Sequence, residues 1–311
     1  MQNIKFSDPE IFLPLQPGTQ LPVAFIQSSN TGLRRTYGVK ICWQIEGNIE
    51  TVQMQYRISC LKRTDEIYLW EISKQYFFVN GFLSDNPMDE LAIACAKILY
   101  PIKFWMAANG IIPKLDNGTE IKERFATNKP LLERDFKGSV AKKYFDKIEH
   151  SLQTPSELDK VITQDIWLCL FLTPLSGRYN NFERLQTINI PFWGAKPRVT
   201  FIGSSTVKDQ LTEWKTKTVT FEGKLDLETL PAQIKYDYQP ISGEMKLTYD
   251  LDETNHRIQN ILCEASITTQ AHGKINLNLT GYQQTDAIEK DVPVISKLKE
   301  KPWKWYSIFD I

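Results

Sequence analysis

The residues best suited to bind a metal ion or to transfer protons are three histidines that lie far apart in the sequence. They are His150, His256 and His272, and none has a second histidine or a cysteine at ligand spacing beside it. A zinc site needs ligands that converge on one ion. The sequence therefore predicts no metal and no cofactor, and we expect these histidines at helix ends and turns.

The acidic segment from Asp250 to His256 is similar to the opening of a calcium-binding loop. Such a loop needs glycine at its sixth position and glutamate at its twelfth, where this chain has Asn255 and Ile261. Both requirements fail. Because Asp and Asn readily adopt turn conformations, the segment is predicted to be a polar turn between two strands.

No nucleophile or phosphate-binding motif is present in the sequence. Gly203-Ser204-Ser205 lacks the G-x-S-x-G spacing of a nucleophile elbow, and neither a Gly-rich loop ending in Gly-Lys-Ser/Thr nor a G-x-G-x-x-G motif occurs. The 37 acidic residues are scattered along the chain, so a pair of carboxylates drawn from them does not by itself indicate a catalytic site. We predict no catalytic residues, although an enzyme of unrecognised type stays open.

Aromatic side chains are the feature that stands out, and they suggest two binding regions. Near the C-terminus, Trp303, Trp305, Tyr306 and Phe309 lie within seven residues. This segment either adds to a partner protein as a strand or folds back over its own sheet. A second set could line a concave apolar pocket or simply belong to the core, and its members are Tyr68, Trp70, Tyr76, Phe78, Trp105 and Trp167.

Charge and hydropathy narrow the classes of partner. Basic and acidic residues number 37 each, and neither half of the chain has a long run of one sign. Nucleic acid and anionic membrane surfaces need clustered cations, so we expect neither. The most apolar window, Met88 to Met106, is interrupted by charged residues and Pro101, and no signal peptide is visible. We expect a soluble, cytoplasmic protein whose five scattered cysteines are unpaired.

Alternation of apolar and polar residues predicts strands at both ends of the chain. Residues 39–46 and 51–60 alternate on either side of Gly47-Asn48, which indicates a tight hairpin. A third strand follows, in which Ile67 to Ile72 and Tyr76 to Val79 are apolar on both faces, and we expect it to be covered on both. From residue 187 onward the period of two returns in several runs, among them Val219 to Leu227, Ile234 to Tyr238, Met245 to Leu251, Ile261 to Ile267 and Ile275 to Leu279.

Helical spacing takes over in the middle of the chain. Asn86 and Pro87 are typical of a helix start, and that helix is expected to continue to Asn109-Gly110 with a kink at Pro101. Asp116-Asn117-Gly118 predicts a hairpin between residues 111–115 and 119–124. Two further helices follow, one over residues 129–152 and one after the cap Thr154-Pro155-Ser156-Glu157.

These elements predict an α+β fold, in which a curved antiparallel β-sheet, or two sheets, carries a central helical segment packed on it. A single β-rich domain over residues 1–311 is expected. It comprises N-terminal strands (residues 36–82), the helical middle (86–172), a strand meander (187–283) and a tail (284–311).

The order of elements resembles an uncharacterised family of bacterial β-rich proteins, which are usually exported. The resemblance rests on Ile111 to Arg124 around Asp116-Asn117-Gly118, on Ser156 to Leu172, and on Gly243 to Asp252 with the strand after it. It covers about two thirds of the chain and implies strands, a helical middle and a strand meander. The family has no known activity, so it implies a fold and no function.

Two classes of function are favoured over an enzyme. The first is a non-catalytic protein that interacts with another protein, as a structural or accessory subunit of a larger bacterial assembly. Balanced charge and abundant aromatic residues favour it. The alternative is a carrier of a hydrophobic small molecule, held in a cavity between the sheet and the helices.

Overall fold

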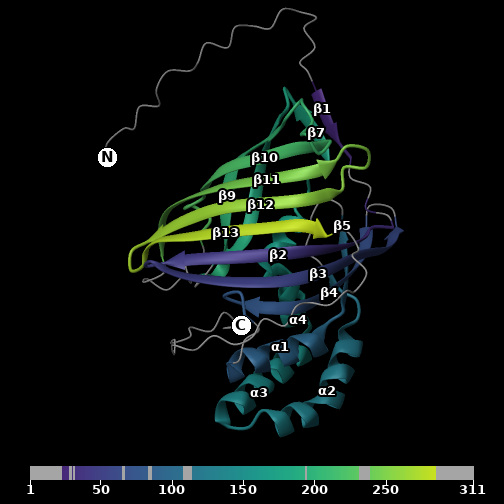
Figure 1. Ribbon diagram of the computed structural model, residues 1–311, viewed down its shortest axis with the longest axis vertical. Coiled ribbons are helices and arrows are strands. Elements are labelled where there is room, and N and C mark those ends of the chain that lie inside the picture. The colour runs from purple at the N-terminus through teal and green to yellow at the C-terminus, as the bar shows by residue number, and fades with distance from the viewer. Residues whose placement is uncertain are drawn as a thin grey trace, which may run out of the picture.

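The protein is built on one antiparallel sheet. The computed structural model describes residues 23–27, 30, 32–64, 67–82, 86–107, 114–192, 195–230 and 239–284. Within these residues, thirteen strands form the sheet in the order β1-β7-β8-β9-β10-β11-β12-β13-β2-β3-β4-β5-β6 (Figure 1). They are β1 (Val23–Ile26), β2 (Arg34–Ile45), β3 (Asn48–Thr64), β4 (Ile67–Val79), β5 (Ile102–Ala107), β6 (Lys114–Leu115), β7 (Gly177–Asn180), β8 (Glu183–Phe192), β9 (Ala195–Val207), β10 (Thr216–Leu225), β11 (Pro240–Asp252), β12 (Ile258–Thr269) and β13 (Gly273–Gln284).

Local turn chemistry sets the register of the long hairpins. Ile45 pairs with Asn48 across β2 and β3, so the turn is Glu46-Gly47, one residue earlier than the sequence predicts. Both turn residues have positive φ, 50° and 82°, which matches the twist of a two-residue hairpin. The polar turn between β11 and β12 is confirmed. Asp252 Oδ1 accepts hydrogen bonds from the backbone N–H groups of Thr254 and Asn255 there.

The inner face of the sheet is filled by a short helix of the same chain. This helix, α5 (Ile166–Phe171), has Trp167 fully buried, 5.7 Å from the ring of Tyr37 and 6.0 Å from the ring of Tyr56. Trp167 also packs on Gly281 of β13, where a Cβ atom would lie about 2 Å from the indole ring. The hydroxyl of Tyr249 donates to the carbonyl of Leu170 at 2.8 Å. The helix is therefore wedged against strands from both halves of the sheet.

The other helices gather at one end of the molecule, beside β4 and β5 (Figure 1). They are α1 (Pro87–Leu99), α2 (Gly118–Asp135), α3 (Ser139–Gln153) and α4 (Pro155–Thr163). The main contacts of α1, α2 and α3 are with one another. Among the described residues, no helix combines the length and the apolar character that crossing a bilayer requires.

The prediction of an α+β fold with a central helical segment packed on the sheet is wrong. The protein is mostly one large sheet, and the longer helices lie at its end. Of the helices that the structure describes, only the six-residue α5 enters the inner face. The reason lies in the helix surfaces. The buried apolar positions of α2 are Ile121, Phe125 and Leu132, a narrow stripe that neighbouring helices cover. Such a stripe cannot also cover a broad sheet.

Three local predictions fail because tertiary pairing overrides turn and helix signals. The helix expected up to Gly110 ends at Leu99, and the residues after Pro101 form β5, which pairs with β4. Asp116-Asn117-Gly118 is no hairpin turn, because α2 begins at Gly118. The helix expected over residues 129–152 is instead α2 and α3, separated at Gly138, which has a φ of 110°. An apolar run therefore did not distinguish a helix from a strand.

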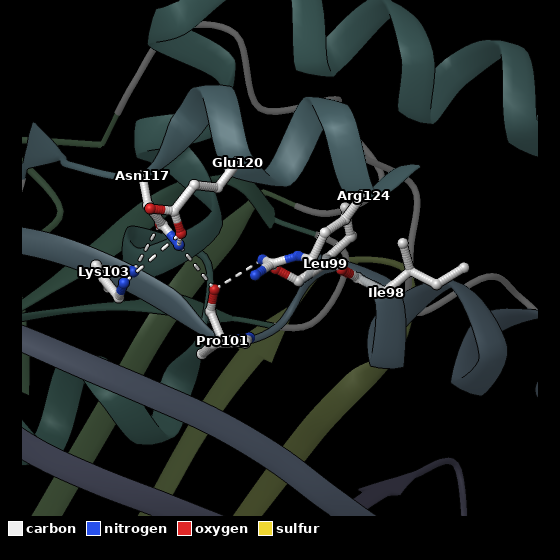
Figure 2. A network of polar contacts seen from close by, with 7 residues as sticks. All are labelled: Ile98, Leu99, Pro101, Lys103, Asn117, Glu120 and Arg124. Atoms are coloured by element: carbon white, nitrogen blue, oxygen red, sulfur yellow. Dashed lines mark hydrogen bonds and ion pairs between the residues drawn. The ribbon is translucent and has the colours of Figure 1, made fainter. Parts of the chain in front are cut away.

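A polar network joins the end of α1 to the start of α2 (Figure 2). Arg124 donates to the backbone carbonyls of Ile98 at 3.1 Å, Leu99 at 2.9 Å and Pro101 at 2.8 Å. Asn117 adds two bonds, from its amide nitrogen to the carbonyl of Pro101 and from the backbone N–H of Lys103 to its amide oxygen. Carbonyls at a helix C-terminus have no partner within the helix, so these donors satisfy them.

Replacing Arg124 by methionine is expected to lower the free energy of unfolding by about 1–3 kcal/mol, because three carbonyls lose their charged donor. Arg134→Met is the matched control, since Arg134 is exposed and forms an ion pair with the adjacent Asp135. Its effect should be much smaller than that of Arg124→Met, because both members of this ion pair are exposed to solvent. Urea unfolding of both variants measures the difference, and equal effects would show that the Arg124 network contributes nothing.

Candidate functional site

A hollow of about 370 Å³ opens on the outer face of the sheet, the face opposite α5. Its lining residues come from three adjacent strands and are Arg34 and Thr36 of β2, Arg57 and Ser59 of β3, and Glu71 of β4. Two guanidinium groups, two hydroxyl groups and one carboxylate therefore face the same space. The volume is within the range of small-molecule sites.

Strand register brings these side chains together. Arg34 lies opposite Ser59, and Thr36 lies opposite Arg57, so the two arginines are diagonal neighbours on one face. Ser59 also lies opposite Glu71 on the next strand. In each strand the lining residues alternate with buried ones, such as Tyr37, which fix the opposite face in the core.

A row of glutamine side chains crosses the outer face next to the hollow. Gln75 Nε2 donates to Gln55 Oε1 at 2.6 Å, and Gln55 Nε2 donates to Gln284 Oε1. Gly38 lies beneath this row, where a Cβ atom would be 2.7 Å from Gln284 Nε2. The row links β4, β3 and β13 and passes over Gly38 of β2, which has no side chain. These hydrogen bonds restrain the side chains that border the hollow.

A buried ion pair is the other concentration of ionisable groups. Lys74 Nζ of β4 lies 2.5 Å from Asp165 Oδ2, and the hydroxyl of Tyr56 donates to the same oxygen at 2.9 Å. Lys74 Nζ also lies 5.1 Å from the ring centroid of Tyr56 and 5.3 Å from that of Tyr100. Asp165 accepts from the N–H of Leu168 and so caps α5. The cluster ties α5 to β3 and β4.

The protonation states of Lys74 and Tyr56 do not suit either residue to act as a nucleophile. Burial opposes the charged form of Lys74, but Asp165, Tyr100 and Tyr56 raise the pKa of Lys74 well above its ordinary value. Burial, together with the Asp165 carboxylate, raises the pKa of Tyr56 as well. At neutral pH the lysine is therefore an ammonium and the tyrosine a neutral phenol, so neither is a nucleophile.

Only part of the predicted aromatic pocket comes together in the structure. Tyr68, Trp70 and Trp167 are buried on the inner face, where Trp70 and Trp167 both approach the ring of Phe171. The other predicted members lie elsewhere. Tyr76 is exposed, Phe78 is half-buried, and Trp105 donates from Nε1 to Asp116 Oδ1 at 2.8 Å. The tail residues Trp303, Trp305, Tyr306 and Phe309 lie outside the described residues.

The histidines and cysteines lie apart in the structure. His150 lies in the last turn of α3, and His256 and His272 lie in strand connections, with His272 Nδ1 2.9 Å from Glu46 Oε1. In the part of the chain that the structure describes, no three His, Cys, Asp or Glu residues are grouped so as to hold a metal ion. All five cysteines are unpaired.

Sequence reasoning missed both the hollow and the buried ion pair. Alternation in Arg34-Arg35-Thr36 and Arg57-Ile58-Ser59 places the lining residues of each strand on one face. It gives no register between strands, so it could not bring the two arginines together. Lys74 follows the apolar positions of β4 at a spacing of two, which is a signal for a core-facing lysine that needs a partner.

Comparison with known proteins establishes no family. No protein-family model matches the chain, and no curated protein does so. Among solved structures, the chain is similar to one described as lipid-protein interactions in lipovitellin, with a TM-score of 0.39 and 10% sequence identity. The alignment covers 84% of this chain and 26% of that one, so this chain spans about a quarter of that protein's length. A likeness of this strength carries no functional argument.

Proposed function

We propose that this protein is a non-catalytic interaction protein, and that the outer face of its sheet binds another protein. The observation that carries the proposal is the contrast between the two faces. The inner face is occupied by α5 and its aromatic rings, whereas none of the helices in the described part of the chain lies across the near face of β10 to β13, β2 and β3 (Figure 1). A large, ordered surface of this kind suits a protein partner.

The outer face also has an apolar centre with a polar border. Leu262 of β12 and Tyr282 of β13 are diagonal neighbours, because Leu262 pairs with Thr280 and Asn260 pairs with Tyr282. Their side chains are 45% and 50% exposed. Threonine and charged residues surround them, among them Thr248, Glu264, Thr280 and Lys40. Interfaces commonly have such an exposed apolar anchor within a polar rim.

Site-specific cross-linking in the cells of origin tests this proposal. A photo-reactive phenylalanine analogue at position 262 should give one discrete protein adduct. The same analogue at Trp214, which is 77% exposed in the connection between β9 and β10, should not.

The purified adduct partner then provides the quantitative arm. Leu262→Glu should weaken its binding by about tenfold or more, because the new carboxylate would lose its water at the centre of the interface without gaining a partner. Trp214→Glu should leave binding unchanged, and the melting temperature of both variants should stay near that of the native protein, since both sites are exposed. Identical adducts at both positions, or equal binding by both variants, would refute the proposal.

A hydrophobic small molecule is the second candidate ligand, and one observation favours it. Among the residues that the structure describes, the buried indole Nε1 atoms of Trp70 and Trp167 find no hydrogen-bond partner. Buried donors of this kind normally have an acceptor, so a ligand oxygen beside these rings would satisfy them. Native mass spectrometry of the freshly purified protein decides the matter: a carrier shows a reproducible mass excess that organic extraction removes, and a filled core shows none.

A further inference from the structure

We propose that the hollow on the outer face of β2, β3 and β4 binds a small molecule that carries a phosphate or carboxylate group and, next to it, an ammonium or hydroxyl group. This inference concerns other residues of the same outer face than Leu262 and Tyr282, and its test uses the isolated protein without a partner. Its basis is the presence of complementary groups on three adjacent strands around one space of about 370 Å³.

The two arginines define the anionic part of the ligand. Arg34 and Arg57 are diagonal neighbours on β2 and β3, and both line the hollow. Their like charges repel one another, and an oxyanion between them removes that repulsion. Planar guanidinium groups bind carboxylate and phosphate through two parallel hydrogen bonds, which makes an oxyanion the best complement for this pair.

Hydroxyl groups complete the oxyanion subsite. Thr36 lies opposite Arg57, and Ser59 lies opposite Arg34, so each hydroxyl is next to one guanidinium. Ser59 is buried, whereas the two arginines are exposed, so the hydroxyl of Ser59 lies toward the floor and the cations lie at the rim. A hydroxyl group can donate a hydrogen bond to an oxyanion, so this floor fits phosphate or carboxylate oxygens.

Glu71 defines the second part of the ligand. It lies opposite Ser59 on the β4 side, and within the described part of the chain neither Glu71 nor Arg34 nor Arg57 forms an ion pair. A carboxylate at this position repels a bare anion but accepts a hydrogen bond from an ammonium or hydroxyl group. The site therefore discriminates in favour of a ligand with both groups over inorganic phosphate.

Isothermal titration calorimetry of the full chain with four probes tests the inference. The probes are O-phosphoethanolamine, 3-aminopropanoate, inorganic phosphate and ethanolamine. At least one of the first two should bind with a stoichiometry of one. Inorganic phosphate should bind about tenfold more weakly or worse, since it lacks the group that Glu71 accepts, and ethanolamine should not bind.

Variants assign the binding to the hollow. Arg34→Gln and Arg57→Gln should each weaken the better probe by about tenfold or more, because each removes a charged donor pair. Glu71→Gln should weaken that probe but strengthen inorganic phosphate, a reversal that general unfolding does not produce. Arg178→Gln, at an exposed position of β7, is the matched control and should change nothing.

The outcomes separate cleanly. Absence of saturable binding for both two-group probes overturns the inference, and so does binding that survives both arginine variants. Phosphate that binds as tightly as O-phosphoethanolamine, with no effect of Glu71→Gln, also overturns it, because the second part of the ligand would then have no role. Unchanged melting temperatures in all four variants show that each comparison is made on folded protein.

Discussion

Lys74→Met is expected to lower the free energy of unfolding by about 3–5 kcal/mol, because it leaves Asp165 as a buried charge without its counter-ion. The side chain of Asp165 is 5% exposed and that of Lys74 is 17% exposed, so water cannot replace the lost partner. Asp165 also caps α5 and accepts from Tyr56, so the protein cannot turn it outward without losing both bonds. Urea unfolding monitored by tryptophan fluorescence measures the loss.

Two further variants isolate the pair itself. Lys246→Met removes an exposed ion pair with Glu222, 3.0 Å long, and should cost less than about 1 kcal/mol. The double variant Lys74→Met with Asp165→Asn should be less destabilised than the sum of its single variants, because no unpaired charge remains buried. If Lys74→Met and Lys246→Met cost the same, the cluster does not anchor α5.

The pH dependence of the pair has a defined sign. The pKa of Lys74 is raised in the folded protein, so its contribution to stability is fully present below the ordinary lysine pKa. It is lost as the pH rises through the folded-state pKa. Lys74 therefore stays protonated at neutral pH. The difference in stability between the native protein and Lys74→Met should shrink only in strongly alkaline solution, where Lys74 loses its proton.

Gly281→Ala is expected to lower the free energy of unfolding by about 3 kcal/mol or more. A Cβ at position 281 would lie 1.9 Å from Cζ3 and 2.1 Å from Cη2 of Trp167. These are ring atoms of a fully buried side chain on a helix that is itself fixed by Asp165. The ring cannot move away without displacing α5, and the strand cannot move away without separating β13 from β12 and β2.

A second-site change should relieve this clash. Trp167→Phe removes the larger ring and by itself should cost about 1–3 kcal/mol through the space it leaves. In that background, Gly281→Ala should cost less than about 1 kcal/mol, so the two changes should be strongly coupled. Thermal unfolding of the four proteins completes the cycle. Equal costs of Gly281→Ala in both backgrounds would show that the glycine is not required for helix packing.

Local patterns predicted some elements well and others poorly, for identifiable reasons. The hairpin of β2 and β3 and the meander of β11, β12 and β13 were predicted, because one buried face favours alternation of apolar and polar residues along much of each strand. The strand β5 was predicted as helix, since its six residues read as an apolar run in either conformation. Pairing with β4 decides it.

The sequence alone determined the building units: alternating strands, a charged helical middle, turns at glycine and aspartate, and the absence of any known catalytic or metal-binding motif. Each of these depends on residues close together in the chain, where local propensity and periodicity act. Only the tertiary structure decided that one sheet joins both ends of the chain through β13 and β2, that Gly281 admits Trp167, and that Arg34 and Arg57 face one hollow. These contacts join residues far apart in sequence, and their geometry is set by strand register and packing, which no local pattern specifies.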